Sequence, residues 1–123
     1  MSKIIGIIGS RSRDTNVDGK LVWETFKKVY VKGDSIRSGL CSQGGDRFAV
    51  VIADWLQLPE SQRLWFPADW QKHGKIAGFI RNTDIAKNSN ILIACVRSNR
   101  TGGTEDTIKK FIKFYSNINL ILV

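Results

Sequence analysis

Residues 3–9, "KIIGIIG", have the pattern of a fully buried β-strand, because the segment is short, rich in β-branched residues and ended by a glycine. Comparable apolar runs, of which "ILIACV" is the clearest, recur at residues 34–40, 62–69, 91–96 and 119–123. Between them, apolar residues at helical spacing predict helices at residues 18–33, 44–58, 74–90 and 103–117. Strands and helices therefore alternate along the whole chain.

This alternation predicts an α/β fold, a Rossmann-like three-layer sandwich in which a five-stranded parallel sheet carries helices on both faces. The strand order 3-2-1-4-5 is favoured, and periodicity alone leaves the order 2-1-3-4-5 open. The chain of 123 residues fits one domain, residues 1–123, without repeats or linkers. In the helix at residues 44–58, the expected core-facing side chains are Phe48, Val51, Ile52 and Trp55.

Composition and charge narrow the class of partner. The chain is 42% hydrophobic and 24% charged, which is typical of a folded globular protein. Nineteen Lys and Arg residues against eleven Asp and Glu residues leave a net charge of +8, which favours anionic partners such as nucleotides or nucleic acid.

Other classes of partner and location are disfavoured. No apolar run approaches the roughly 20 residues of a membrane-spanning helix, and the N-terminal apolar run is too short for a signal peptide, so no membrane partner is expected. Two cysteines do not form a disulfide framework, which favours a reducing cytoplasm as the location. With one histidine and two distant cysteines, we expect neither a metal site nor a cofactor.

In parallel sheets of this kind, ligands bind outside the carboxyl ends of the strands, near the point where the strand order reverses. The loops that follow the predicted strands are rich in glycine, hydroxyl and cationic residues. The candidate ligand-binding residues in these loops are Gly9, Ser10, Arg11, Gly39, Gly44, Gly45, Asp46, Asp69, Trp70, His73, Gly102, Gly103 and Thr104.

Two of these loops have the composition of phosphate-binding loops. "SQGGD", residues 42–46, and "RTGGT", residues 100–104, each place two glycines at the predicted start of a helix. The first N–H groups of a helix are unpaired there, and the helix dipole favours an anion. The alternative is that these glycines only make tight turns between strand and helix. The nearby cations Arg11, Arg97 and Arg100 favour phosphate binding.

Several other candidates have two interpretations. Asp46 can bind a ribose hydroxyl or cap its helix, and capping is favoured. Trp70 can stack on a base or pack against the domain. His73, placed in the loop before a helix, can act as a donor, a general acid or a cap, or make a structural hydrogen bond. Cys41, at the mouth of a loop, is interpreted as a small apolar residue.

Arg81 is predicted to point inward. On a helix that begins near Gly74, it shares a stripe with apolar and small residues and is drawn toward the sheet. A guanidinium held there needs an anionic partner, because an unpaired buried charge is costly. That partner is either a phosphate or one of the carboxylates of Asp46, Asp69 and Asp84.

Four segments, "GSRSRD", "SGLCSQGGDRFA", "FPADWQKHGKIAGFIRN" and "GGTEDTI", resemble the stand-alone YspA-type family of the SLOG superfamily. This superfamily also contains the DNA-processing protein A (Smf) domain and the LONELY GUY phosphoribohydrolases. The resemblance spans almost the whole chain and is most specific at residues 67–82, where Asp69, Trp70, His73, Arg81 and Asn82 match. It implies a Rossmann-like sheet with a pocket for a nucleotide or nucleotide-derived ligand.

The chain also departs from these relatives. Leu40 stands where the family has a glycine, in a second loop that is one residue longer. In the phosphoribohydrolases a glutamate acts in cleavage of the N-glycosidic bond, and Thr107 falls at its position. Arg81 corresponds to the arginine that those enzymes pair with the glutamate. The candidate catalytic residues are therefore Arg81 together with the neighbouring acids Glu105 and Asp106.

Three functions follow as hypotheses. The leading one is binding of a nucleotide-like small molecule, as a sensor or as a sponge that sequesters it. The second is hydrolysis of a nucleoside 5′-monophosphate at its N-glycosidic bond. The third is binding of DNA or RNA, whose affinity should fall steeply with salt. The apolar last strand also provides an edge through which two copies of the chain can pair.

Overall fold

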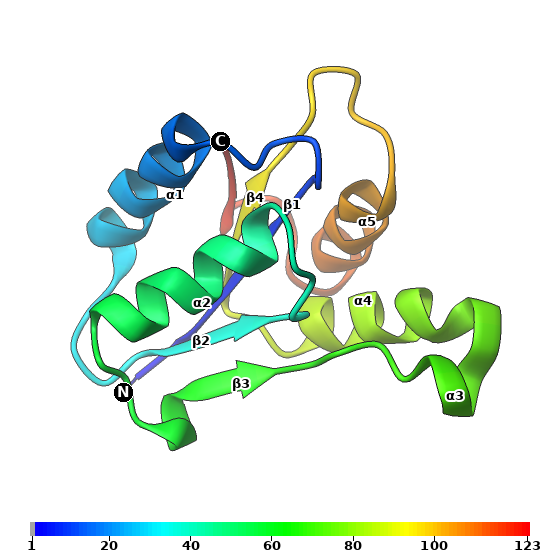
Figure 1. Cartoon of the computed structure of the whole chain (residues 1–123), viewed down its shortest axis with the longest axis horizontal. Helices are drawn as coiled ribbons and strands as arrows, with labels where there is room; N and C mark the ends of the chain where they lie inside the picture. The colour runs from blue at the N-terminus through cyan, green and yellow to red at the C-terminus, as the bar shows by residue number, and fades with distance from the viewer. Residues whose placement is uncertain (1) are drawn as a thin grey trace.

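The computed structural model describes residues 2–123 and confirms the alternation of strands and helices (Figure 1). The strands are β1 (Ile4–Gly9), β2 (Ser35–Ser38), β3 (Arg63–Trp65), β4 (Ile91–Cys95) and β5 (Leu120–Leu122). The α-helices are α1 (Asn16–Val29), α2 (Gly45–Trp55), α3 (Trp70–His73), α4 (Ala77–Lys87) and α5 (Gly103–Tyr115). Two short 3₁₀ turns, η1 (Glu60–Gln62) and η2 (Gly74–Ile76), complete the chain.

The five strands form one parallel sheet in the order β3-β2-β1-β4-β5. The order 3-2-1-4-5 is thereby confirmed over the alternative 2-1-3-4-5. In the central pair, Gly9 at the end of β1 lies opposite Cys95 at the end of β4. The strand order reverses between β1 and β4, so the loops after these two strands start side by side and diverge over opposite halves of the sheet.

The helices cover both faces of the sheet, which gives the predicted three-layer sandwich (Figure 1). One core cluster joins α1 and α2 to the sheet and includes the fully buried Val22, Phe26 and Ile36. The other joins α4 and α5 to the opposite face through Ile85 and Phe111. No helix among residues 2–123 has the length and apolar character needed to cross a membrane.

Helix α2 lies unusually close to β1. It buries the small residues Gly45, Ala49 and Ala53 in addition to two larger apolar side chains. This changes the face that was expected to be buried, since Val51 is 52% exposed and Trp55 is 76% exposed. The helix is rotated so that its alanines, which permit a closer approach than larger side chains, face the strand.

The region after β3 also differs from expectation. Strand β3 ends at Trp65, short of the predicted residues 62–69, and the chain then leaves the sheet through Pro67. A short helix follows, capped by Asp69, whose carboxylate accepts a hydrogen bond from the Lys72 N–H at 3.0 Å. Gly74, with φ of +58°, ends that helix, so His73 lies at its last position and not in a loop.

Candidate functional site

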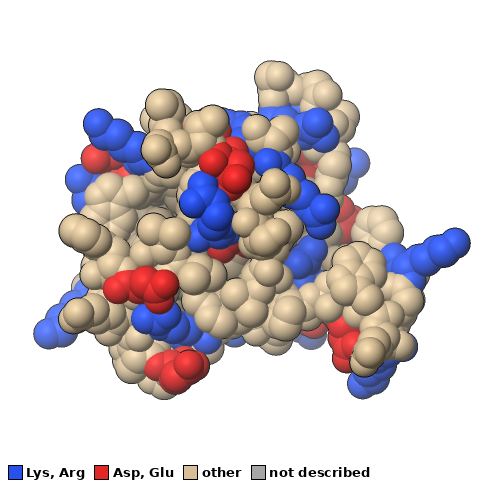
Figure 2. Space-filling view, in the orientation of Figure 1, with Lys and Arg blue, Asp and Glu red and all other residues tan. Residues whose placement is uncertain are grey.

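A cleft of about 510 Å³ lies beside the carboxyl ends of β1 and β4, where the strand order reverses. Cationic side chains gather around this region, over the loops that follow the two strands and beside α4 and α5 (Figure 2). The cleft is lined by Ile8, Gly9, Ser10, Arg11, Ser12, Cys41, Asp46, Arg81, Asn82, Ile85, Arg97, Thr101, Gly102, Gly103, Thr104 and Thr107. Its lining therefore combines arginines, hydroxyl groups and glycines.

The structure brings many of the predicted ligand-binding residues together and leaves others apart. Those that line the cleft are Gly9, Ser10, Arg11, Asp46, Arg81, Asn82, Gly102, Gly103 and Thr104. Those that do not line it are Gly39, Gly44, Gly45, Asp69, Trp70 and His73. For every residue in both groups, contact with a ligand remains a prediction.

The start of α5 is open toward the cleft. Gly102 is its N-cap residue, with φ of +99°, and no side chain caps the helix. A Cβ atom added at Gly102 would lie 3.7 Å from the nearest side-chain atom, and one added at Gly103 would lie 3.9 Å from it. The first N–H groups of α5 are thus accessible to an anion in the cleft.

The start of α2 is built differently, although its sequence is similar. The Gly44 N–H donates to Asp14 Oδ1 at 2.7 Å, and Arg47 Nε donates to the same oxygen at 2.7 Å. These hydrogen bonds, that of Gly44 first, lower the pKa of Asp14. A Cβ atom added at Gly45 would lie 2.1 Å from the carbonyl carbon of Ile8. Gly45 therefore allows α2 to pack closely on β1, and binding of phosphate at this loop remains a prediction.

Arg81 points inward, as predicted. Its Nε donates to Asn82 Oδ1 at 3.0 Å and its Nη1 donates to the Gly39 carbonyl oxygen at 3.2 Å. Of the three carboxylates considered as partners, Asp46 is the one that pairs with it, at 4.0 Å between Nη1 and Oδ2. Arg81 thereby holds the loop after β2 against α4 on the floor of the cleft.

Two further arginines in the lining have no such role. Within residues 2–123, the side chains of Arg11 and Arg97 form neither a hydrogen bond nor an ion pair. Arg97 Nη1 is the atom nearest to a Cβ built at Gly102, so this guanidinium lies beside the open start of α5. A planar guanidinium with unused donors is well suited to binding a phosphate at two points.

Asp46 is buried in the wall of the cleft, with 7% of its surface exposed. Burial raises the pKa of this carboxyl, although hydrogen bonds from Ser38 and Cys41 and the charge of Arg81 oppose the rise. Its side chain does not cap α2, contrary to the favoured interpretation, because the N-cap residue is Gly44 and the carboxyl group faces backward. There it lies 2.8 Å from Ser38 Oγ and accepts from the Cys41 N–H at 3.0 Å.

Hydrogen-bond counting agrees with a protonated Asp46. The buried Ser38 hydroxyl has one proton but faces two oxygens, the Ile7 carbonyl at 2.6 Å and Asp46 Oδ1 at 2.8 Å. If Ser38 donates to Ile7, a protonated Asp46 can donate to Ser38, and every group has a partner. This hydrogen-bond pattern acts in the same direction as burial, whereas the Cys41 N–H and the charge of Arg81 at the other carboxyl oxygen act in the opposite direction.

We expect Asp46→Asn to be at least as stable as the natural protein, since an amide reproduces the hydrogen bonds of a protonated acid. A raised pKa means that the folded state holds this proton more tightly than the unfolded state, so the natural protein loses stability as pH rises through the folded pKa. Each tenfold difference in proton affinity between the two states corresponds to about 1.4 kcal/mol. Urea denaturation of both proteins at pH 4 and pH 8 should show the advantage of the variant growing with pH, because the loss begins above the ordinary carboxyl pKa of 3.8.

Asp46→Ala is the control, because it removes both hydrogen bonds and should lower the free energy of unfolding by about 1–3 kcal/mol at either pH. An advantage of Asp46→Asn that shrinks as pH rises would contradict the assignment of a raised pKa to Asp46.

The two candidate catalytic acids do not line the cleft. Glu105 binds Arg100 through two hydrogen bonds of 2.8 and 3.0 Å. Asp106 accepts from Asn82 Nδ2 at 3.1 Å and from Lys110 Nζ at 2.8 Å. Among the described residues that line the cleft, Asp46 is the one that carries a carboxyl group.

The match to the phosphoribohydrolases is thus incomplete at the decisive position. Thr107, which aligns with their glutamate, is buried and lines the cleft. Its hydroxyl donates to the Gly103 carbonyl oxygen at 3.4 Å. Gly103 and Thr107 are one helical turn apart and share one face of α5. Because Gly103 lines the cleft, Thr107 lines it as well.

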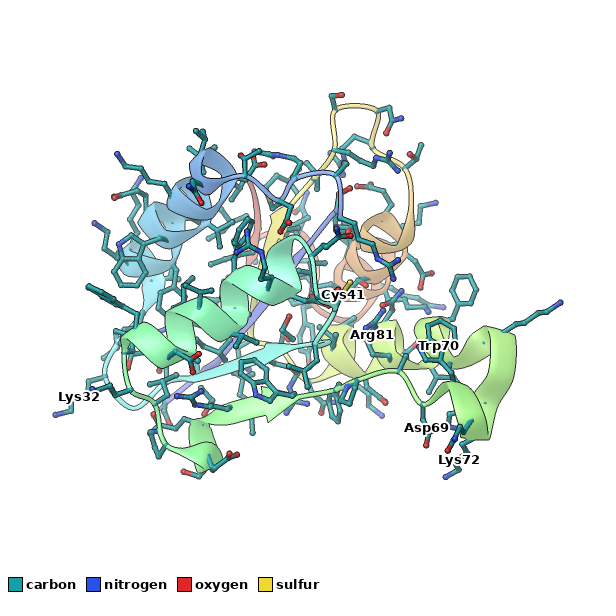
Figure 3. All side chains as sticks on the ribbon, in the orientation of Figure 1. Lys32, Cys41, Asp69, Trp70, Lys72 and Arg81 are labelled. Carbon is teal, nitrogen blue, oxygen red and sulfur yellow. The ribbon has the colours of Figure 1, made fainter. Side chains whose placement is uncertain are left out.

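The predicted residues after β3 lie apart from the cleft (Figure 3). Asp69 caps α3, and Trp70 is 58% exposed, with its ring 3.5 Å from a Cβ built at Gly78. Trp70 therefore packs over α4, and stacking of a base on its exposed side chain remains a prediction. Figure 3 shows Cys41 and Trp70 near Arg81, whereas Asp69 and Lys72 lie farther out.

The sequence interpretation missed Cys41 as a residue of the cleft. This half-buried thiol lines the cleft, and its N–H is bound by Asp46. The available signal was its place at the mouth of the loop after the second strand, where the structure turns the chain at Leu40, whose φ is +58°.

Comparison of the chain with models of known protein families, with curated proteins and with solved structures finds no match. The resemblance to the YspA-type family therefore remains a prediction from the motifs.

Proposed function

We propose that the cleft binds a nucleotide-like small molecule through its phosphate group and that the chain acts as a binding protein, either a sensor or a sponge. The observation that carries this proposal is the pair Arg11 and Arg97, two arginines without an intramolecular partner among the described residues, in a cleft that also exposes the start of α5. The motif resemblance to the SLOG superfamily supports the same ligand class.

The proposed arrangement assigns a role to each side of the cleft. Phosphate oxygens accept from the backbone N–H groups of Gly103 and Thr104 and from the fork of Arg97. The polar floor of Asp46 and Asn82 faces the sugar. The volume of about 510 Å³ lies within the roughly 300–1,000 Å³ of small-molecule sites.

The two alternatives have less support. Hydrolysis of an N-glycosidic bond requires an acid near the sugar, and Glu105 and Asp106 are both bound elsewhere. Binding of DNA or RNA rests on the net charge of +8, whereas the free arginines of the site lie in a concave cleft. Salt dependence separates the two kinds of binding, since a polyanion gives a steep slope.

Calorimetric titration with AMP, CMP, ADP and inorganic phosphate tests the proposal, and we expect saturable binding of at least one nucleotide with one site per chain. Reaction with a thiol reagent locates the site. Cys41 should react in the folded protein and be protected by bound nucleotide, because it lines the cleft. Cys95 is fully buried, and burial raises the pKa of its thiol, so it should react only on unfolding.

Two outcomes would count against the proposal. One is the absence of binding by every nucleotide at millimolar concentration. The other is binding that leaves the reaction rate of Cys41 unchanged, which would place the ligand elsewhere. Release of free base from AMP during the titration would instead support the hydrolase.

A further inference from the structure

A second hollow of about 440 Å³ adjoins the cleft. It is lined by Ser12, Arg13, Val96, Arg97, Ser98 and Asn99. Ser12 and Arg97 line both the hollow and the cleft, so the two volumes meet at these side chains. The hollow is referred to below as the outer hollow.

Both volumes are bordered by the same two loops, the loop after β1 and the loop after β4. The loop after β1 contributes residues 10–12 to the cleft and residues 12–13 to the outer hollow. The loop after β4 contributes residues 96–99 to the outer hollow and residues 101–102, with Arg97, to the cleft. Together they form one groove across the ends of the two central strands.

Charge is distributed unevenly along this groove. Arg13, in the outer hollow, is already bound by the chain: it donates to Asp18 Oδ1 and to the carbonyl oxygens of Val96 and Val123. Arg97, at the junction, has no partner among the described residues. Beyond it, Ser98 and Asn99 are exposed and uncharged. The free positive charge therefore lies at Arg11 in the cleft and at Arg97 at the junction, with a neutral polar surface at the outer end of the groove.

This distribution matches a ligand whose anionic group lies near Arg11 and Arg97 and whose outer end is uncharged. Resting on the proposed function, we propose that the groove binds a nucleoside diphosphate esterified to a second sugar or nucleoside. The diphosphate lies at Arg97, the first nucleoside in the cleft, and the second group in the outer hollow. Hydroxyl groups of that second sugar meet Ser98 and Asn99, whose side chains both donate and accept hydrogen bonds.

Comparison of ADP with ADP-ribose, and of UDP with UDP-glucose, tests this inference by calorimetry on the intact chain. Each pair has the same base and the same number of phosphates. We expect the esterified member to bind about tenfold more tightly, as one or two added hydrogen bonds would give. The esterified member carries less negative charge, so charge alone would favour the opposite order.

Ser98→Trp fills the outer hollow and should abolish the tenfold difference while leaving the affinity for ADP and UDP unchanged. Ser61→Trp, at an exposed serine in η1, is the matched control and should preserve the difference. Unchanged binding of ADP shows that the Ser98 variant is folded.

Equal affinities within each pair would contradict the inference that a second sugar or nucleoside binds in the outer hollow. A difference in affinity that persists in Ser98→Trp would contradict it as well. Both results would leave the proposed function intact. Failure of all four compounds to bind or to protect Cys41 would overturn both proposals.

Discussion

Replacing Gly45 by alanine is expected to lower the free energy of unfolding by about 4 kcal/mol or more, or to prevent folding. The added Cβ would lie 2.1 Å from the carbonyl carbon of Ile8, 2.3 Å from its oxygen and 2.4 Å from the Gly9 nitrogen. These are backbone atoms of the central strand, so no rotamer change relieves the clash. Urea denaturation followed by far-UV circular dichroism measures the effect.

Gly103→Ala is the matched control, because Gly103 is the second glycine of the other Gly-Gly loop and also begins a helix. Its added Cβ would lie 3.9 Å from the nearest atom, and alanine favours a helix, so the stability should change by about 1 kcal/mol or less. A Gly45→Ala protein as stable as Gly103→Ala would show that α2 does not pack against β1 as closely as described.

Replacing Arg97 by alanine is expected to reduce nucleotide affinity by about 10- to 100-fold, since a hydrogen-bonded pair with a charged group contributes about 1.5–3 kcal/mol. Stability should stay within about 0.5 kcal/mol of the natural protein, because the side chain has no described partner to lose. Calorimetric titration with the tightest-binding nucleotide gives the affinity, and urea denaturation gives the stability.

Two variants control for charge and geometry. Arg100→Ala removes a cation from the same loop that is already bound to Glu105 and does not line the cleft, so it should leave affinity nearly unchanged. Arg97→Lys keeps the charge but loses the planar fork, and should recover only part of the affinity. Equal losses from Arg97→Ala and Arg100→Ala would point to a general effect of charge and against a specific contact.

Much of the fold was predictable because it rests on local patterns. The central strands β1 and β4 are short apolar runs, β2 gives a weaker signal, and the intervening helices have apolar stripes, so the alternation was readable without tertiary information. The rotation of α2 could not be predicted in this way. Ala49 and Ala53 carry a weak apolar signal next to Val51 and Trp55, and only the close approach of Gly45 to β1 makes them the buried face.

The site was predictable where it follows from sheet order. Residues after β1 and β4, such as Ser10, Arg11 and Gly102, must meet at the point where that order reverses. The two Gly-Gly loops could not be distinguished in sequence, because a glycine that admits a ligand and one that admits a neighbouring backbone look the same. The tertiary neighbour decides, and it is Ile8 for Gly45.

The residues after β3 lie apart from the cleft for another reason. Strand β3 is at the edge of the sheet and ends at Trp65, so Asp69, Trp70 and His73 are carried outward past Pro67. A longer third strand would have delivered them to the same edge as the other loops. Strand length at a sheet edge depends on pairing with one neighbour only, which apolar periodicity does not report.

The loop after β4 is the part of this domain in which the ligand specificity can be changed. Arg100 and Glu105 tie the loop to α5 from outside, and residues 97–102 contribute no side chain to either core cluster. A segment that borders a groove but supports no core can be lengthened, shortened or exchanged with little loss of fold. Libraries randomised at Ser98, Asn99 and Thr101 are therefore the natural route to domains with new ligand specificity on an unchanged scaffold.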